Sequence, residues 1–557
     1  MKKILIILIV NTLIWQFDTI KGNTLPLSNT PGNDKVYFFT DRNLYVASEP
    51  ILFSSFIENS SGLRSSVLYV EIVSQNGLSF YSSKFRISGQ KANGSIHIPA
   101  DIPTGTYFVK AYTKWMRNFS PDSYAYVPIK LINLSSHTLG AKKNGKNGSN
   151  GAYVNFEKVD CSNDIIESNR NTYKPREEAT LTLNFQTLDA DFVWSCLSIA
   201  PSAAIDYSYN ITNGSKSKEP VIIYQPEQEG ISISGKVIKA ESEELVPHAL
   251  VNISILGPYS DFIPVRTDFN GYFNLNLPAI NGKYDLYIGI EGDTQNRVII
   301  DNDFCTKSNG INYTLFSISD KEQQAAQNIL NNIEVSKQFP IPTNPLSSDT
   351  HLAFQTLDPF YGTPDVVFEF KKYVDLLSIK EYFFELIPVS VRERKGIVTF
   401  GFPENYAEFK MFDPLLMIDN VVVTDASRIL AADPNLLSKI EIISKPYYKG
   451  NMVYGGVVSF FSKKGDFAGI ELPSSDIFLN YKFFDNGSNV NYPNFVNENL
   501  PDTRTTILWN SDLQMDKDVP TVVTFQTPDT KGDYDILLRG ITSKGKVMFI
   551  RHTIKVK

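Results

Sequence analysis

Short apolar runs separated by turn residues fill the first quarter of the chain. Apolar and polar residues alternate in segments at 36–39, 51–53, 67–73, 95–98 and 105–112. A period of two places the apolar side chains on one face of a strand, and short strands at this spacing are typical of an antiparallel sandwich. The pattern therefore predicts a β-sandwich over residues 30–134.

Two motifs in this segment resemble a known domain. Thr40-Asp41-Arg42-Asn43-Leu44-Tyr45 precedes Glu49-Pro50, and Ile102-Pro103-Thr104-Gly105-Thr106-Tyr107 follows later. The segment resembles the second macroglobulin-type domain of α2-macroglobulin-like proteins, which runs from a D-R/K-x-x-Y opening to a P-x-G-x-Y strand. The resemblance implies a seven-stranded immunoglobulin-like sandwich.

The same alternation predicts further sandwiches. Residues 173–177 and 179–185 repeat the opening of the first domain and predict a second sandwich over 152–228. Strand-like runs near 505–510, 519–525 and 532–540 predict a closing sandwich over 469–557.

Residues 231–300 carry a different signature. Gly235-Lys236-Val237 is followed by Pro247-His248-Ala249-Leu250-Val251 and by Thr267-Asp268-Phe269-Asn270-Gly271-Tyr272-Phe273. These motifs resemble the carboxypeptidase regulatory-like domain. The resemblance implies a small sandwich over 229–305 that serves folding and spacing and has no catalytic residues.

Two connecting segments separate the predicted domains. Residues 135–151 are rich in Gly, Asn and Lys and predict a flexible linker, so we expect an extended chain that proteases cut there first. Within a second linker, 306–345, Ser319 and Glu322 form a capping box. After the capping box, one face of the segment is apolar and carries Ala326, Ile329, Leu330 and Ile333. The pattern predicts one amphipathic helix that ends at Pro340.

The pattern becomes mixed over residues 346–468. Residues 374–387 have the apolar density of a buried helix, and Asp433-Pro434 favours a helix start. Strands at 415–418 and 421–423 are joined by Asp419-Asn420, which suits a tight hairpin turn.

This mixed segment resembles the plug domain of TonB-dependent outer-membrane receptors. The matching segments are 414–420, 439–445 and 454–465, with Asn420 where the family has glycine. Only 92 residues follow Gly465 in a chain of 557. A receptor barrel needs about 22 strands of roughly 10 residues, so we expect this chain not to be the transporter itself.

The apolar strands of the mixed segment must be covered. The strands at 415–418, 440–443 and 457–461 have too many apolar side chains for both faces of their sheet to be exposed to water. We therefore expect the 374–387 helix on one side of the sheet and a neighbouring domain or partner on the other.

The start of the chain predicts export. Met1-Lys2-Lys3 precedes an apolar run over 4–17 and then Gly22, which is the layout of a signal peptide over residues 1–22. A membrane anchor is the alternative, but the run is shorter than the usual ~20 residues. No cysteine precedes Cys161, so we expect no lipid-modified N-terminal cysteine. The predicted location is the periplasm or the outer membrane.

Composition narrows the class of protein. Hydrophobic residues at 42% and charged residues at 20% indicate folded domains, and a net charge of -7 gives no basic footprint for nucleic acid. Abundant Tyr and Phe favour strands. The predicted fold class is mainly β: a string of immunoglobulin-like β-sandwich domains plus one small α+β plug-like domain.

The sequence offers little catalytic chemistry. Cys161, Cys196 and Cys305 are scattered, outside any thioester or C-x-x-C motif, and allow at most one disulfide. The five histidines lie in five segments, and no G-x-S-x-G turn occurs. We therefore predict no enzyme, no metal site and no cofactor.

Tyr447, Tyr448 and Lys449 are the candidate partner contacts. They precede the turn at Gly450, and exposed aromatic residues suit protein or sugar recognition. In so aromatic a chain, each such residue is more often part of a core. The same holds for Trp115 and Tyr361, which also lie near polar segments.

The sequence favours two possible functions. The first is a non-enzymatic cell-envelope scaffold or accessory protein that associates with outer-membrane uptake machinery of the TonB-dependent type through the plug-like domain. Its expected partner is an outer-membrane or periplasmic protein. The alternative is an adhesin or a ligand- or glycan-binding protein that uses sandwich loops.

Overall fold

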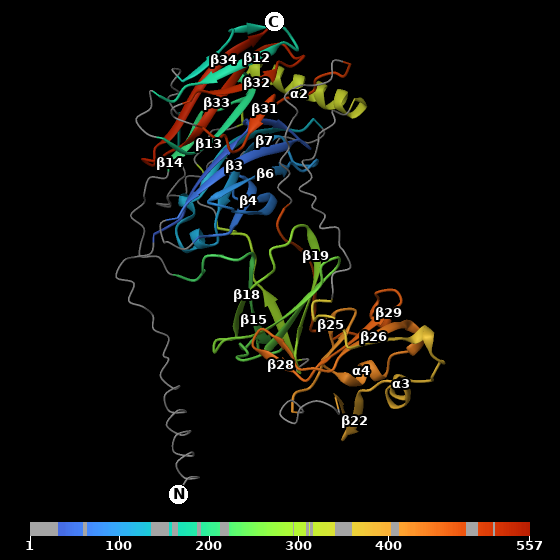
Figure 1. Cartoon of the computed structure of the whole chain (residues 1–557). Helices are drawn as coiled ribbons and strands as arrows, with labels where there is room; N and C mark the ends of the chain where they lie inside the picture. The colour runs from blue at the N-terminus through green and yellow to red at the C-terminus, as the bar shows by residue number, and fades with distance from the viewer. Residues whose placement is uncertain are drawn as a thin grey trace.

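The computed structural model is mainly β, as predicted, with three β-sandwiches and a small α+β domain arranged in two lobes (Figure 1). Residues 1–22 and 135–151, the predicted signal peptide and linker, lie outside the described residues. No helix in the described part is long and apolar enough to cross a membrane. The structure describes residues 32–59, 64–134, 155–158, 165–186, 191–211, 222–292, 295–307, 311, 316–339, 359–402, 411–485, 499–515 and 519–557.

The first sandwich (residues 32–134) packs a three-stranded sheet, β1-β3-β6, on a five-stranded sheet, β2-β8-β7-β4-β5. Its alternating apolar residues meet between the sheets. It has eight strands rather than seven, because the short β2 adds to β8 in parallel. The strands are β1 (Lys35–Thr40), β2 (Leu44–Val46), β3 (Pro50–Glu58), β4 (Val67–Ser74), β5 (Ser79–Arg86), β6 (Lys91–His97), β7 (Gly105–Tyr112) and β8 (Ala125–Ile132).

The second sandwich is built from two distant parts of the chain, residues 165–211 and 499–557. Its sheets are β10-β12-β32 and β11-β34-β33-β13-β31, so strands from both parts pair directly. The prediction of separate sandwiches over 152–228 and 469–557 is therefore wrong. Neither part has enough strands to cover its own apolar face. The strands are β10 (Ile166–Ser168), β11 (Thr172–Tyr173), β12 (Glu178–Leu183), β13 (Phe192–Pro201), β31 (Leu508–Asn510), β32 (Thr521–Gln526), β33 (Gly532–Thr542) and β34 (Val547–Val556), with β9 (Asn155–Lys158) and β14 (Ser208–Ile211) as a separate pair.

The third sandwich covers residues 231–300 and gains one strand from beyond the α+β domain. Its sheets are β18-β15-β20 and β17-β16-β19-β30, and β30 pairs antiparallel with β19. The strands are β15 (Ser232–Lys239), β16 (Leu250–Leu256), β17 (Asp261–Arg266), β18 (Tyr272–Asn276), β19 (Lys283–Ile290), β20 (Asn296–Ile300) and β30 (Ile477–Lys482).

The α+β domain (residues 359–470) has one five-stranded sheet, β21-β26-β29-β24-β25. Asp419 and Asn420 join β24 to β25 with φ of 48° and 67°, which confirms the predicted tight hairpin. Pro434 opens a single 3-10 turn after Asp433. The elements are β21 (Val366–Glu369), α3 (Ile379–Glu385), β22 (Ser390–Arg394), β23 (Ile397–Gly401), β24 (Leu415–Ile418), β25 (Val421–Val422), α4 (Ala426–Leu430), β26 (Leu437–Ile443), β27 (Tyr447–Lys449), β28 (Met452–Tyr454) and β29 (Val457–Ser462).

Both faces of this sheet are covered, as the sequence predicted. On one face, Ile418, Ile440 and Phe460 pack with α3. On the other, Met417 and its neighbours pack on Phe262 of the third sandwich. The predicted helix over 374–387 is too long: α3 begins after Ser378, whose side chain accepts from the N–H of Glu381.

Helix α2 (Asp320–Gln338) lies against the upper lobe. Ser319 and Glu322 form the predicted capping box. Ala325 and Ala326 pack with Leu44 of the first sandwich and Ala204 of the second. The helix therefore holds the first and second sandwiches together.

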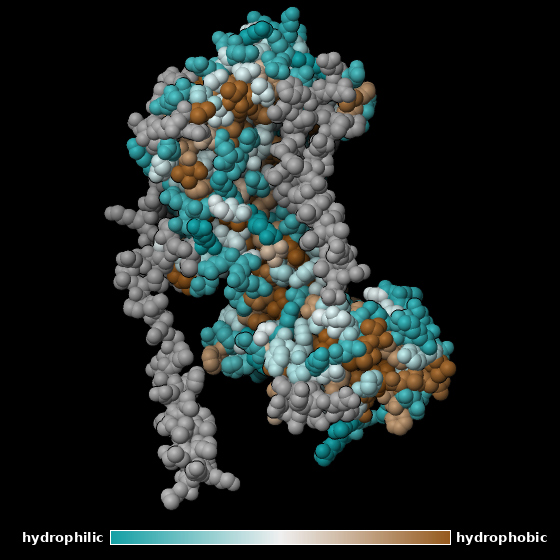
Figure 2. Space-filling view, viewed as in Figure 1, coloured by the Kyte–Doolittle hydropathy of each residue, from teal (hydrophilic) through white to brown (hydrophobic). Residues whose placement is uncertain are grey.

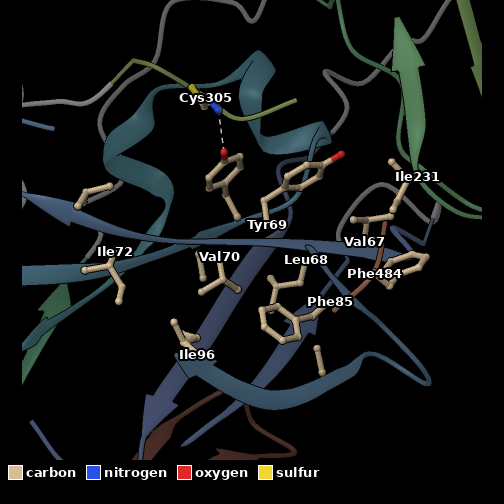
Figure 3. Packing of buried hydrophobic residues seen from close by; sticks show 14 of the residues in the cluster. Val67, Leu68, Tyr69, Val70, Ile72, Phe85, Ile96, Ile231, Cys305 and Phe484 are labelled. Carbon is tan, nitrogen blue, oxygen red and sulfur yellow. Dashed lines mark hydrogen bonds between the residues drawn. The ribbon is translucent and has the colours of Figure 1, made fainter. Parts of the chain in front are cut away.

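The first and third sandwiches share a continuous core. Figure 3 shows Ile231, Cys305 and Phe484 packed beside strand β4, and the backbone N–H of Cys305 donates to the Tyr112 hydroxyl at 2.7 Å. Three lysines are buried at this junction: Lys84 pairs with Asp303 at 2.5 Å, Lys110 pairs with Glu71 at 2.9 Å, and Lys114 donates to the Ser232 carbonyl at 2.8 Å. The described parts of the two lobes are thus joined by buried contacts.

Candidate functional site

The three candidate contact residues lie on a hairpin next to the third sandwich. Strand β27, Tyr447–Lys449, pairs with β28 around Gly450, whose φ of 57° favours glycine. The structure brings Tyr447 and Lys449 to the junction with the third sandwich. Tyr448 points elsewhere and is 61% exposed.

The junction has an apolar centre. Phe262 of β17 is fully buried against Met417 and Val457, and Tyr447 packs at its edge. Tyr361 is buried there too, and its hydroxyl donates to Glu441 at 2.6 Å. Burial and this hydrogen bond raise the pKa of Tyr361. Both Tyr361 and Trp115 are therefore core residues.

A cleft of about 430 Å³ lies on one side of this apolar centre. Lys449 pairs with Asp261 at 2.5 Å, and Lys439 pairs with Glu441 at 2.5 Å. The Lys439 ammonium also lies 4.5 Å from the centre of the Phe461 ring. Both lysines are neutralised by a carboxylate, so this cleft has no excess positive charge for an anionic ligand.

A second cleft, of about 340 Å³, lies between the same two domains. Its floor is the outer face of the third sandwich, where Asn252 faces Gly289 and Ser254 faces Tyr287 across the β16–β19 ladder. Its roof is the segment from Val422 to Arg428. We call it the junction cleft.

Asp476 forms one end of the junction cleft. The Tyr287 hydroxyl donates to its carboxylate, and Ser475 donates at 3.2 Å. Burial raises the pKa of Asp476. A Cβ at Gly289 would lie 2.7 Å from an Asp476 oxygen, so a larger residue there would have to displace this carboxylate.

Sequence reasoning missed the junction cleft. The alternation of Asn252 and Ser254 with Val251, Ile253 and Ile255 was visible, but polar residues on a strand normally face water. Gly289 inside an apolar strand was the other signal, because such a glycine often marks a close approach.

The His and Cys side chains of the described residues do not gather at one site. They contain no group of three His, Cys, Asp or Glu side chains that could bind a metal. The nearest Ser–His contact is between Ser168 Oγ and His552 Nε2, at 2.8 Å. Cys196 and Cys305 are both buried and free, while Cys161 lies outside the described residues.

Comparisons with known proteins give no family. No family model and no curated protein matches the sequence. Among solved structures, Salmonella α2-macroglobulin reacted with methylamine is 9% identical, covering 94% of this chain and 40% of its own, with a TM-score of 0.24. Native Escherichia coli α2-macroglobulin is 8% identical, with coverage of 96% and 40% and a TM-score of 0.24.

A further neighbour covers less of the chain. Dimeric latent PorU from Porphyromonas gingivalis is 10% identical, covering 48% of this chain and 33% of its own, with a TM-score of 0.15. This chain spans 40% of the length of the two α2-macroglobulins. Structural similarity at TM-scores this low does not indicate a function or a partner for this chain.

Proposed function

We propose that this protein is a non-enzymatic cell-envelope accessory protein that docks on an outer-membrane protein of the TonB-dependent type through its α+β domain. The observation that carries the proposal is an apolar surface on that domain. We call it the outer apolar face and define it by Val374, Leu377, Phe384 and Ile397, which are 72%, 92%, 86% and 67% exposed.

Exposed apolar side chains are concentrated on the α+β domain. Nearly half of the exposed large hydrophobic side chains among the described residues belong to the α+β domain. Figure 2 shows apolar surface gathered on the outer part of the lower lobe. Contiguous exposed apolar surface in soluble proteins usually marks an interaction site.

The position of the outer apolar face favours docking. The α+β domain is attached to the third sandwich on the side of Phe262, while α3 covers the other side of its sheet. Leu377 precedes α3 and Phe384 lies on it. Burying such side chains contributes about 25 cal/mol per Å² of apolar area to association.

Charges around this face would contribute little. Lys372 pairs with Glu369 at 2.8 Å, and Lys380 pairs with Glu393 at 3.2 Å, all at the surface. Exposed pairs of this kind contribute roughly 0–1 kcal/mol. The proposed association is therefore driven by apolar contact and depends weakly on salt.

The class of partner is suggested by the plug-like motifs. The three matching sequence segments overlap β24, β26 and β29, which are neighbours in one sheet with β29 at the centre. In the receptors that these motifs resemble, the plug lies inside a barrel, so the resemblance supports an outer-membrane receptor as the class of partner.

A pull-down from detergent-solubilised envelopes tests the docking. We expect the full chain to recover an outer-membrane protein and the double variant Leu377→Asp with Phe384→Asp to recover at least about ten-fold less, because charged side chains would be buried in the interface. The matched control is Val519→Asp with Val522→Asp, which changes two exposed apolar residues of the second sandwich. Recovery of no outer-membrane protein, or equal recovery by both variants, would contradict the proposal.

Ligand binding is the second candidate function. One observation favours it: the junction cleft lies between two domains and its lining includes the charged residues Asp425, Arg428 and Asp476.

A further inference from the structure

A groove of about 460 Å³ lies between α2 and the second sandwich. We call it the helix groove. One wall is a face of α2, and the opposite wall includes the start of β33. Ala203, Ala325 and Ile329 belong to its apolar lining. Its volume lies within the ~300–1,000 Å³ typical of ligand sites.

The polar side chains that line the helix groove are accessible. Lys321 and Gln324 of α2 and Lys531, which directly precedes β33, are exposed. Asn328 and Asn332 of α2 are half-buried. A ligand in the groove can therefore contact these side chains directly.

The helix groove carries an excess of positive charge. Within the described part of the chain, Lys321 and Lys531 have no carboxylate partner. The other charged side chains of the lining are each paired with an opposite charge: Arg504 with Asp502 at 2.6 Å, Arg551 with Asp535 at 3.2 Å, and Asp533 with Lys555 at 3.7 Å. Two unpaired ammonium groups on facing walls suit a ligand with carboxylates.

A row of amide side chains follows the helical wall. Gln324, Asn328 and Asn332 are spaced four residues apart, so they lie on one face of α2 at steps of about 6 Å. Gln324 Nε2 donates to Asn328 Oδ1 at 3.2 Å. This bond uses one polar atom of each amide, so Gln324 Oε1 and Asn328 Nδ2 stay available to a ligand.

The spacing of this row matches an extended peptide. Two residues of an extended chain span about 6.4–6.8 Å, which is close to the ~6 Å between successive amides of the row. Each side-chain amide has a donor and an acceptor, as each peptide unit has. The row can therefore exchange hydrogen bonds with every second peptide unit of a chain lying along α2.

We propose that the helix groove binds an extended peptide segment of about four residues that carries acidic side chains. The amide row holds the peptide backbone, and Lys321 and Lys531 pair with the carboxylates. The groove is in the upper lobe, whereas the outer apolar face is on the α+β domain. Peptide binding thus goes beyond the docking proposed above, and Leu377→Asp with Phe384→Asp should leave it unchanged.

A peptide array tests the proposal. The full chain is applied to capped hexapeptides that vary at their four central positions, and the strongest binders are measured in solution by fluorescence anisotropy, up to about 1 mM. We expect these binders to contain Asp or Glu. Their affinity should fall as NaCl rises from about 50 to about 300 mM, because salt screens exposed charges.

A charge reversal tests the role of the lysines. Lys531→Glu should weaken the selected peptides about ten-fold or more, because the reversed charge repels their acidic side chains. Lys544→Glu is the matched control, since Lys544 is exposed after the other end of β33 and lies outside the groove. It should change the affinity less than about two-fold.

The amide row has its own control. Gln324→Ala with Asn328→Ala should weaken binding about ten-fold, because it removes hydrogen bonds to the peptide units. Gln327 and Asn331 form the same kind of amide pair, at 3.1 Å, on a part of α2 outside the groove lining. Gln327→Ala with Asn331→Ala should therefore bind like the natural protein. Thermal unfolding checks that all four variants fold.

The proposal is overturned if no array peptide binds, if the binders lack acidic residues, or if each groove variant binds like its control. Trigalacturonic acid, a short chain of acidic sugars, tests the other class of ligand. We expect it not to displace a selected peptide. Displacement at an equal concentration would show that the groove recognises negative charge alone, and would overturn the assignment to a peptide.

Discussion

The first and second sandwiches open with the same motif in two different environments. Asp41-Arg42-Asn43-Leu44-Tyr45 ends in Glu49, and Asn169-Arg170-Asn171-Thr172-Tyr173 ends in Glu177 at the same spacing. In each, the segment around the tyrosine pairs in parallel with the last strand of its domain. The two motifs allow the effect of burial to be separated from the effect of local sequence.

The local geometry of the two motifs is the same. The Tyr45 hydroxyl donates to Asp41 at 2.7 Å, and the Tyr173 hydroxyl donates to Asn169 at 2.5 Å. Each of these acceptor side chains also accepts the backbone N–H eleven residues later, at Leu52 and at Thr180. The arginine of each motif then pairs with its glutamate.

The two motifs differ in what covers them. The second sandwich packs on the first motif, so the Arg42 and Glu49 side chains are 4% and 8% exposed and Arg42 Nε donates to Thr506 at 3.3 Å. The Arg170 side chain is 63% exposed. The same ion pair is therefore an interface element in one sandwich and a surface contact in the other.

Replacing each arginine by alanine should give the largest difference in folding stability between the two motifs. Arg42→Ala leaves Glu49 buried and unpaired, and we expect a loss of about 3–5 kcal/mol. Arg170→Ala should cost less than about 1 kcal/mol, because exposed pairs are weak. Urea unfolding followed by circular dichroism measures both. Equal destabilisation would show that burial does not distinguish the two motifs.

Thr506→Val should have an intermediate effect. The Thr506 hydroxyl donates to Asp41 and accepts from Arg42, so its loss should cost about 1–3 kcal/mol. Thr505→Val, the adjacent position, is the control and should cost less. In the Arg42→Ala background the Thr506→Val effect should shrink, because the two side chains share one network. Strict additivity would argue against the network.

The smallest expected effect is a pH dependence in the second sandwich. Burial lowers the pKa of His552 below its usual value of about 6.5. Between the folded and unfolded pKa values the unfolded state binds more protons, so stability rises with pH up to about 6.5 and then levels. The thermal midpoint should show this rise, and His552→Gln should reduce it. An unchanged pH profile in the variant would assign the rise to other groups.

Local signals predicted local structure well. Ser319 with Glu322 gave the start of α2, and Asp419-Asn420 gave the β24–β25 hairpin, because both depend on hydrogen bonds and φ angles within a few residues. The excessive length predicted for α3 shows the limit. The apolar density predicts Val374 and Leu377 to be buried, but both lie on the surface before Ser378 begins the helix.

The sequence does not predict which distant strands pair with each other. The alternation around Glu178 reveals that β12 has an apolar face, but nothing in it indicates pairing with β32 at Gln526. The junction cleft was missed for the same reason. Asn252 and Ser254 read as solvent-facing until the α+β domain, which follows much later in the chain, is placed over them.

The docking of the α+β domain is tested most directly by site-specific photo-crosslinking in intact cells. A benzophenone amino acid at Leu377, on the outer apolar face, should form a covalent adduct with an outer-membrane protein on irradiation. The same probe at Phe269, which is 84% exposed on the third sandwich, should not form that adduct. No adduct from Leu377, or the same adduct from both positions, would contradict docking through the outer apolar face.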